Sequence, residues 1–345
     1  MIELDILRII ALFSVMVLHT ACYDFGGSNY IVNTYIKLSQ CGVPLFLMIT
    51  GNLFLDNNKD YSIFIMFSKY IKRLFIVYIG WSFLYSMYNT IVYNGTKKTF
   101  ILGIFNGEFH LWYLIMCIGI YMIIPILKII VNNTSKYVML YIIALSILWT
   151  FIIPVLNKIE IINILIGQAI KNMNYTFIYG YVTFVLLGFY LSHYKIEYKK
   201  IKYMLFITIF VTVFCIYGEL SNIEIIQLCI SSLGSFSIIS LCISVYLFCL
   251  LKYKIKELKF NKKIQNIIIY ISQNTFTMYL LHEFVNKIFN LIGYNISNFN
   301  PIWSIPVISI SVFLISLIFS IIINFLYKYV KNNIRRGNFY AKNRA

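Results

Sequence analysis

Apolar stretches of about 20 residues recur along the whole chain, and each is long enough to cross the hydrocarbon core of a bilayer as a helix. The chain has 345 residues, of which 60% are hydrophobic and only 12% are charged, so too few polar residues remain to cover a soluble core of this size. The sequence therefore predicts an all-α, polytopic transmembrane helical bundle that forms a single domain over residues 1–345. About ten spans are expected, at 2–21, 36–55, 71–93, 109–131, 137–155, 176–192, 203–219, 226–251, 267–293 and 303–327.

The basic residues indicate how such a bundle is oriented. The segments between spans form two alternating sets, one with 22 Lys and Arg residues and the other with 5. The positive-inside rule places the more basic set in the cytoplasm. We therefore expect both termini in the cytoplasm and an even number of spans, and the net charge of +17 needs no nucleic acid to explain it. The more basic set comprises residues 56–73, 128–136, 193–202, 252–263 and 328–345.

The first span contains three ionisable residues on one helix face. At about 100° of rotation per residue, Asp5, Arg8 and His19 project in nearly the same direction. An ionisable group at the bilayer centre costs about 2.5–3.5 kcal/mol on insertion scales, so such groups usually face a partner or a wet cavity. Asp5 and Arg8, three positions apart, are expected to pair. The alternative is that these residues are interfacial and have no functional role.

The predicted orientation gives Arg8 and His19 different depths. Arg8 lies toward the cytoplasm and His19 in the outer half of the membrane, about 16 Å away along the helix axis. This distance is close to the reach of an extended pantetheine arm. A basic residue that binds phosphates and a histidine that meets a thioester would need about this separation.

Segments from the first to the ninth span resemble acyltransferase family 3, a family of bacterial multi-pass membrane enzymes. Arg8 and His19 match the R-x10-H motif of that family. Thr50 stands where a serine is common, and Lys69-x-x-Lys72-Arg73 lacks the doubled arginine often seen, which leaves the phosphate-binding residue open. The other segments that resemble the family are GVPLFLMITGNLF (42–54), FSKYIKRLFIVY (67–78), FHLWYLIMCIGIYMIIPIL (109–127) and SQNTFTMYLLHEFV (272–285).

The resemblance implies an O-acyltransferase of the short, sugar-acetylating type in the inner membrane of a bacterial cell. Such an enzyme transfers an acyl group, expected to be acetyl, from cytoplasmic acyl-CoA to a hydroxyl of a cell-surface or lipid-linked glycan. Acetyl-CoA is therefore the expected acyl donor. The glycan and the bilayer are the other expected partners, and we expect no metal and no nucleic acid. The acceptor, the acyl group and the oligomeric state stay open.

Three of the four histidines are expected at one depth near the outer face. His19 is the candidate general base or transient acyl carrier. Glu108 or Glu283 could orient it, as carboxylates orient histidines in catalytic triads. The candidates for the CoA phosphates are Arg8, Lys69, Lys72 and Arg73, with Arg73 favoured because arginine binds phosphate bidentately. The candidates for acceptor binding are Asp5, His110, Trp112, Tyr113 and His282.

A membrane transporter or exporter of an amino acid or polysaccharide is the main alternative. Charged residues inside the membrane also mark ion and solute pathways, and some relatives in the family are thought to serve such transport. Inverted internal repeats would favour a transporter, and none is visible in the sequence. A purely structural membrane protein would have no need of buried Asp5, Arg8 and His19.

Overall fold

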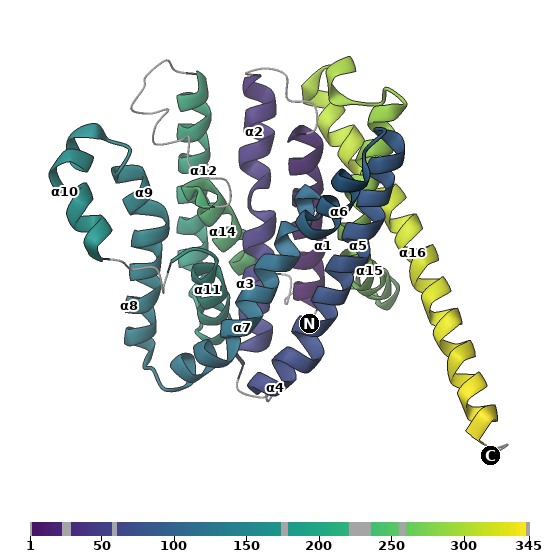
Figure 1. Ribbon diagram of the computed structural model, residues 1–345. Helices are drawn as coiled ribbons and strands as arrows, with labels where there is room; N and C mark the ends of the chain where they lie inside the picture. The colour runs from purple at the N-terminus through teal and green to yellow at the C-terminus, as the bar shows by residue number, and fades with distance from the viewer. Residues whose placement is uncertain are drawn as a thin grey trace.

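The computed structural model describes residues 2–22, 29–56, 61–173, 179–220, 236–254 and 260–342, and the regular structure in these residues is helical throughout. The helices stand side by side in a bundle (Figure 1). The longer elements are α1 (Ile2–Cys22), α2 (Tyr30–Ser39), α3 (Gly42–Phe54), α5 (Lys72–Val92), α6 (Lys97–Asn106), α7 (Trp112–Asn132), α8 (Lys136–Ile147), α10 (Glu160–Met173), α11 (Tyr181–His193), α12 (Tyr198–Leu220), α14 (Ile238–Lys254), α15 (Lys262–Leu291) and α16 (Pro301–Lys342).

Shorter segments connect these helices. A π-helical turn, Met66–Ile71, joins α4 (Ile63–Ile65) to α5, and a second, Leu148–Ile152, joins α8 to α9 (Ile153–Leu156). A 3₁₀ turn at Phe109–Leu111 leads directly into α7. Helix α1 begins in the lower half of the bundle in Figure 1, and α16 projects beyond the other helices on the same side.

Five helical stretches in the described residues have the length and composition needed to cross a membrane, and they correspond to five of the expected spans. The all-helical class is thereby confirmed for the described part of the chain. The total of about ten spans and the cytoplasmic side of the termini stay predictions. The expected sixth and eighth spans begin at residues 176–178 and 226–235, which lie outside the described residues. The five stretches are Ile2–Cys22, Lys97–Asn132, Lys136–Leu156, Tyr198–Gly218 and Pro301–Tyr329.

Helices also form in two segments that were expected to be loops. Helix α6 occupies most of 94–108, where the Thr96 side chain accepts a hydrogen bond from the Thr99 amide. Gly107 ends that helix with a φ of 70°, a conformation that favours glycine. Helix α10 likewise fills most of 155–175. These short helices were missed because neither is long enough to look like a span.

The expected second span, 36–55, is not one continuous helix. Helix α2 starts earlier, at Tyr30, and ends at Ser39, and α3 begins at Gly42. A Cβ atom at Gly42 would lie 2.7 Å from the Ala11 carbonyl oxygen, so only glycine lets the chain approach α1 this closely. The break therefore brings the start of α3 directly against the first helix.

Helices α3 and α11 contact each other through two glycines. A Cβ atom at Gly51 would lie 1.9 Å from the Val185 carbonyl oxygen, and one at Gly188 would lie 2.0 Å from that of Met48. Small residues allow two membrane helices to approach closely and to gain van der Waals contact. This contact holds α3, which forms one wall of the cavity described below.

We predict that Gly188→Ala destabilises the protein, because the added methyl group overlaps the backbone of α3. Overpacking of this kind costs about 1–3 kcal/mol. The measurement is thermal unfolding of purified protein in detergent. Gly119→Ala in α7 is the matched control, because its Cβ atom would meet no atom within 4 Å. Equal melting temperatures for the two variants would contradict the packing described here.

Candidate active site

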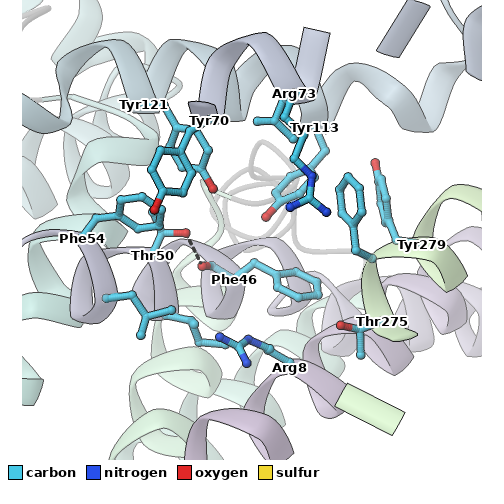
Figure 2. Close-up of a pocket in the computed structure, with 14 residues that line it drawn as sticks. Arg8, Phe46, Thr50, Phe54, Tyr70, Arg73, Tyr113, Tyr121, Thr275 and Tyr279 are labelled. Carbon is cyan, nitrogen blue, oxygen red and sulfur yellow. Dashed lines mark hydrogen bonds between the residues drawn. The ribbon is translucent and has the colours of Figure 1, made fainter. Parts of the chain in front are cut away.

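A cavity of about 400 Å³ lies between α1, α3, α5, α7 and α15, and we call it the arginine cavity. Its volume falls in the usual range for small-molecule sites, which are mostly apolar with a few polar groups. Figure 2 shows Arg8 and Arg73 extending into it from opposite walls. The other lining side chains are Phe46, Ile49, Thr50, Leu53, Phe54, Tyr70, Leu74, Tyr113, Tyr121, Thr275, Phe276 and Tyr279.

Arg8 is held in place by Asp5, the residue with which it was expected to pair. Its Nη1 donates a hydrogen bond to Asp5 Oδ1 at 2.9 Å. The same carboxylate oxygen accepts a hydrogen bond from Ser272 Oγ of α15 at 2.7 Å. The predicted Asp5–Arg8 pair therefore forms, and Asp5 positions Arg8 instead of lining the cavity itself. Arg8 itself lines the cavity, and its guanidinium has further N–H donors besides the one that Asp5 accepts.

The three basic candidates at the start of α5 are placed differently from one another. Arg73 lines the arginine cavity, opposite Arg8. Lys69 and Lys72 are exposed and are not among the lining residues, and the Lys69 ammonium lies 5.5 Å from the centre of the Tyr70 ring. Of the three, Arg73 is thus the one positioned to contact a ligand inside the cavity.

Two tyrosines connect this cavity to a cluster of histidines. The Tyr113 and Tyr279 rings lie 5.4 Å apart at its wall. The Tyr279 ring is also 5.5 Å from His282 and 5.8 Å from His110. A ligand that fills the cavity from the two arginines to Tyr279 therefore ends beside the histidines.

The histidines of three separate elements meet at this point. His19 of α1, His110 of the turn before α7 and His282 of α15 are each at most 9% exposed. His282 Nε2 and His19 Nδ1 lie 2.9 Å apart, within hydrogen-bond distance. The ring centres of His110 and His282 are 5.2 Å apart, and those of His110 and His19 are 6.4 Å apart. The three histidines that were expected at one depth thus lie close together, and their depth in the membrane stays a prediction.

The hydrogen bonds assign the protons of this pair. His282 Nδ1 lies 2.5 Å from the Tyr279 carbonyl oxygen, which can only accept, so Nδ1 carries the proton. In a neutral His282 ring, Nε2 is then the acceptor, and His19 Nδ1 must donate to it. A neutral His19 ring therefore has its free lone pair on Nε2. This is the arrangement of a general base whose ring is oriented by a second group.

The two candidate carboxylates have different neighbours. Glu283 Oε2 lies 3.8 Å from His19 Nδ1, and Glu283 is fully buried. Glu108 Oε2 instead accepts hydrogen bonds from Lys287 Nζ and Asn89 Nδ2, each at 2.9 Å. Glu283 is thus the carboxylate beside His19, whereas Glu108 belongs to a separate polar group.

The remaining candidates from the sequence lie around this centre. His110 is fully buried, and its ring nitrogens have no hydrogen-bond partner among the described residues. Its backbone carbonyl accepts a hydrogen bond from the Tyr279 hydroxyl. Tyr113 lines the arginine cavity, whereas Trp112 is 41% exposed and packs against Tyr181 at 5.8 Å between ring centres. His110 and Tyr113 are therefore near the centre, and Trp112 faces away from it.

Sequence reasoning missed several residues that complete the site. Some of the buried polar side chains of α15 do recur every three or four positions and so share one helix face, namely Ser272, Thr275, Tyr279, His282 and Asn286. This spacing of polar residues is the signal that could have found the missed residues of α15. The missed residues are Tyr70, Tyr85, Asn89, Tyr121, Ser272, Thr275, Tyr279 and Lys287.

Comparison with known protein families identifies the family of this chain. A family model described as an acyltransferase domain matches residues 1–324 of the 345. The chain belongs to acyltransferase family 3. It is accordingly a membrane acyltransferase, and the residues described above are its candidate catalytic and binding groups. No curated protein and no solved structure matches the chain.

The acyltransferase also contains a grouping that could hold a metal ion. Ligand atoms of His19, His282 and Glu283 lie within 4.8 Å of one another. However, His19 Nδ1 and His282 Nε2 already point at each other across a 2.9 Å hydrogen bond. An ion ligated by both nitrogens would have to replace that bond, so the observed geometry favours acid–base chemistry at this pair.

We predict that neutral His19 and His282 both carry their proton on Nδ1, because the Tyr279 carbonyl fixes the first proton and His282 fixes the second. The measurement is ¹⁵N NMR of protein labelled at histidine, which distinguishes protonated from bare ring nitrogens. In His282→Ala, the signal of His19 Nδ1 should lose its fixed protonated state. An unchanged His19 signal in that variant would contradict the hydrogen bond assigned from His19 Nδ1 to His282 Nε2. The internal reference is His193, which is hydrogen-bonded to the Phe189 carbonyl.

Proposed function

We propose that this enzyme transfers an acyl group, acetyl in the simplest case, from cytoplasmic acyl-CoA to a hydroxyl of a cell-surface or lipid-linked glycan, in the inner membrane of a bacterium. The observation that carries the proposal is the His19–His282 hydrogen bond beside the arginine cavity. One end of α1 then supplies a cation to this cavity, and its other end supplies a base. Family membership supports the acyl-transfer chemistry.

The arginine cavity suits the donor. Arg8 and Arg73 enter it from two walls and would hold the phosphates of CoA by charge-assisted hydrogen bonds. Lys69 and Lys72, which are exposed on the preceding turns, would add positive charge at the approach to the cavity. The pantetheine arm would lie along the aromatic wall, with the thioester near Tyr113 and Tyr279.

The histidine pair suits the chemical step. His19 Nε2 takes the proton from the acceptor hydroxyl as its oxygen attacks the thioester carbonyl carbon. The resulting tetrahedral intermediate collapses, the C–S bond breaks, and His19 returns the proton to the departing thiolate. The products are an ester and free CoA, so protons and electrons balance. His282 and Glu283 act by orienting His19 and by stabilising its protonated ring, as the third member of a triad does.

We predict that His19→Ala abolishes acyl transfer but leaves CoA binding intact, because His19 lies beyond the arginine cavity. General-base catalysis contributes about 10²–10⁴-fold to rate. Arg8→Ala and Arg73→Ala should weaken CoA binding instead, by about tenfold or more each. The measurements are transfer of radiolabelled acetyl from acetyl-CoA to a glycan extract, and calorimetric titration with CoA.

Lys136→Ala is the matched control for charge, since Lys136 is exposed at the start of α8 and lines no part of the arginine cavity. It should bind CoA as the unmodified protein does. Transfer that survives in His19→Ala would remove His19 as the base. Solute flux in vesicles without transfer to any acceptor would favour the transport alternative.

A further inference from the structure

A second cavity, also of about 400 Å³, lies at the other end of α5, and we call it the Lys287 cavity. It lies between α5, α6 and α15, which come together at the end of the bundle opposite α4 (Figure 1). The arginine cavity is lined by the first residues of α5, and the Lys287 cavity by its last turns. Its main polar lining consists of Ser86, Asn89, Thr90, Glu108 and Lys287.

In this cavity Lys287, Glu108 and Asn89 are each hydrogen-bonded to the other two, and we call this group the triangle. Lys287 Nζ donates to Glu108 Oε2 at 2.9 Å and to Asn89 Oδ1 at 2.7 Å. Asn89 Nδ2 donates to the same Glu108 oxygen at 2.9 Å. The triangle has no net charge, yet it presents an ammonium, a carboxylate and an amide to one space. An ammonium has three N–H donors. Two of them bond Glu108 and Asn89, so the third can be directed at a ligand.

Tyr85 and His110 lie between the Lys287 cavity and the histidine pair. Tyr85 lines the cavity, and its ring centre lies 5.0 Å from that of His110. His110 in turn lies 5.2 Å from His282. The Tyr85 hydroxyl donates to the Leu280 carbonyl at 2.8 Å and accepts from the Phe284 amide at 3.1 Å, which fixes this ring between α5 and α15. The histidines therefore lie between two cavities of different chemistry.

We propose that the Lys287 cavity binds the sugar that receives the acyl group before its hydroxyl passes Tyr85 and His110 to reach His19, an inference that rests on the function proposed above. A sugar ring is neutral and presents several hydroxyls, each a donor and an acceptor, and the triangle with Ser86 and Thr90 offers both kinds of group. Tyr93, which is 58% exposed, supplies aromatic surface for the ring's apolar face. An anionic headgroup is a poorer match because Glu108 neutralises Lys287, and an apolar ligand would leave the triangle desolvated without compensation.

The acceptor site assigned in this way differs from the one expected from sequence. Among the described residues, neither Trp112 nor Tyr113 lines the Lys287 cavity, whereas Asn89 and Lys287 do. Tyr85 also borders a neighbouring apolar groove of about 290 Å³, lined by side chains such as Tyr88 and Phe284. The hydrocarbon chain of a lipid-linked sugar would bind in this groove, whereas with a polysaccharide acceptor the groove would be filled by membrane lipid. The test separates these two sources of the sugar.

The experiment uses the whole 345-residue chain in micelles of a detergent whose headgroup is not a sugar. Radiolabelled acetyl-CoA is supplied with a panel of hexose and N-acetylhexosamine glycosides, each carrying either a methyl or a dodecyl group. Thr90→Trp fills the cavity, and Asn89→Ala removes one corner of the triangle. Both should raise the KM for the sugar by about tenfold or more, Thr90→Trp by occupying the space of the ring and Asn89→Ala by removing polar partners of the sugar and of Lys287. The KM for acetyl-CoA and the calorimetric affinity for CoA should stay as in the unmodified protein, which also shows that the variants fold.

The control is Ile76→Trp, which introduces the same side chain into α5 at a position that is 59% exposed and lines none of these cavities. It should leave both KM values unchanged. If the unmodified protein acetylates a sugar and Thr90→Trp does so with the same sugar KM, the Lys287 cavity is not the acceptor site, while the proposed function stands. If the unmodified protein acetylates no sugar of the panel, the proposed function fails and this inference with it. A lower KM for the dodecyl glycosides supports a lipid-linked acceptor, and equal values support a polysaccharide.

Discussion

The hydrogen bond between His19 and His282 joins the first helix to α15, and the rest of the site is arranged around that contact. Inside a membrane, polar groups have no water to bind and must find protein partners. The pairing of Asp5 with Ser272 meets the same requirement at the other end of α1. Two polar contacts therefore hold one helix pair, and they fix where the base and the cation of that helix lie relative to α15.

The local features of the first helix could be predicted from sequence because helix geometry alone decides them. Asp5 and Arg8 are three residues apart, so their pairing needed no tertiary information. The partners of His19 could not be predicted in the same way. Glu108 and Glu283 were equal candidates in the sequence. Only the packing of α15 against α1 places the Glu283 carboxylate 3.8 Å from His19 Nδ1, while Glu108 pairs with Lys287.

The fold shows the same division between local and tertiary information. Hydropathy is sufficient to find long apolar helices, and it located the five stretches that meet the length and composition needed for a span. It could not find the break before Gly42, which depends on how closely α3 approaches Ala11 of another helix. It also gave no sign of α6, which places Glu108 and one wall of the Lys287 cavity. Lys287 lies within the expected ninth span, and its hydrogen bonds to Asn89 and Glu108 explain why a buried lysine is tolerated there.

The separation of two cavities by buried histidines bears on how a transferase avoids hydrolysing its donor. Water that reached His19 together with the thioester would compete with the acceptor hydroxyl, and closed sites suppress such side reactions. His110, His282 and Glu283 are each fully buried, and Tyr85 and Tyr279 stand on either side of them. In the proposed reaction, donor and acceptor would therefore meet only where the aromatic walls of both cavities end. Under the proposed orientation, a base at that position would serve a reaction between substrates from the two faces of the membrane, and neither substrate would need to cross.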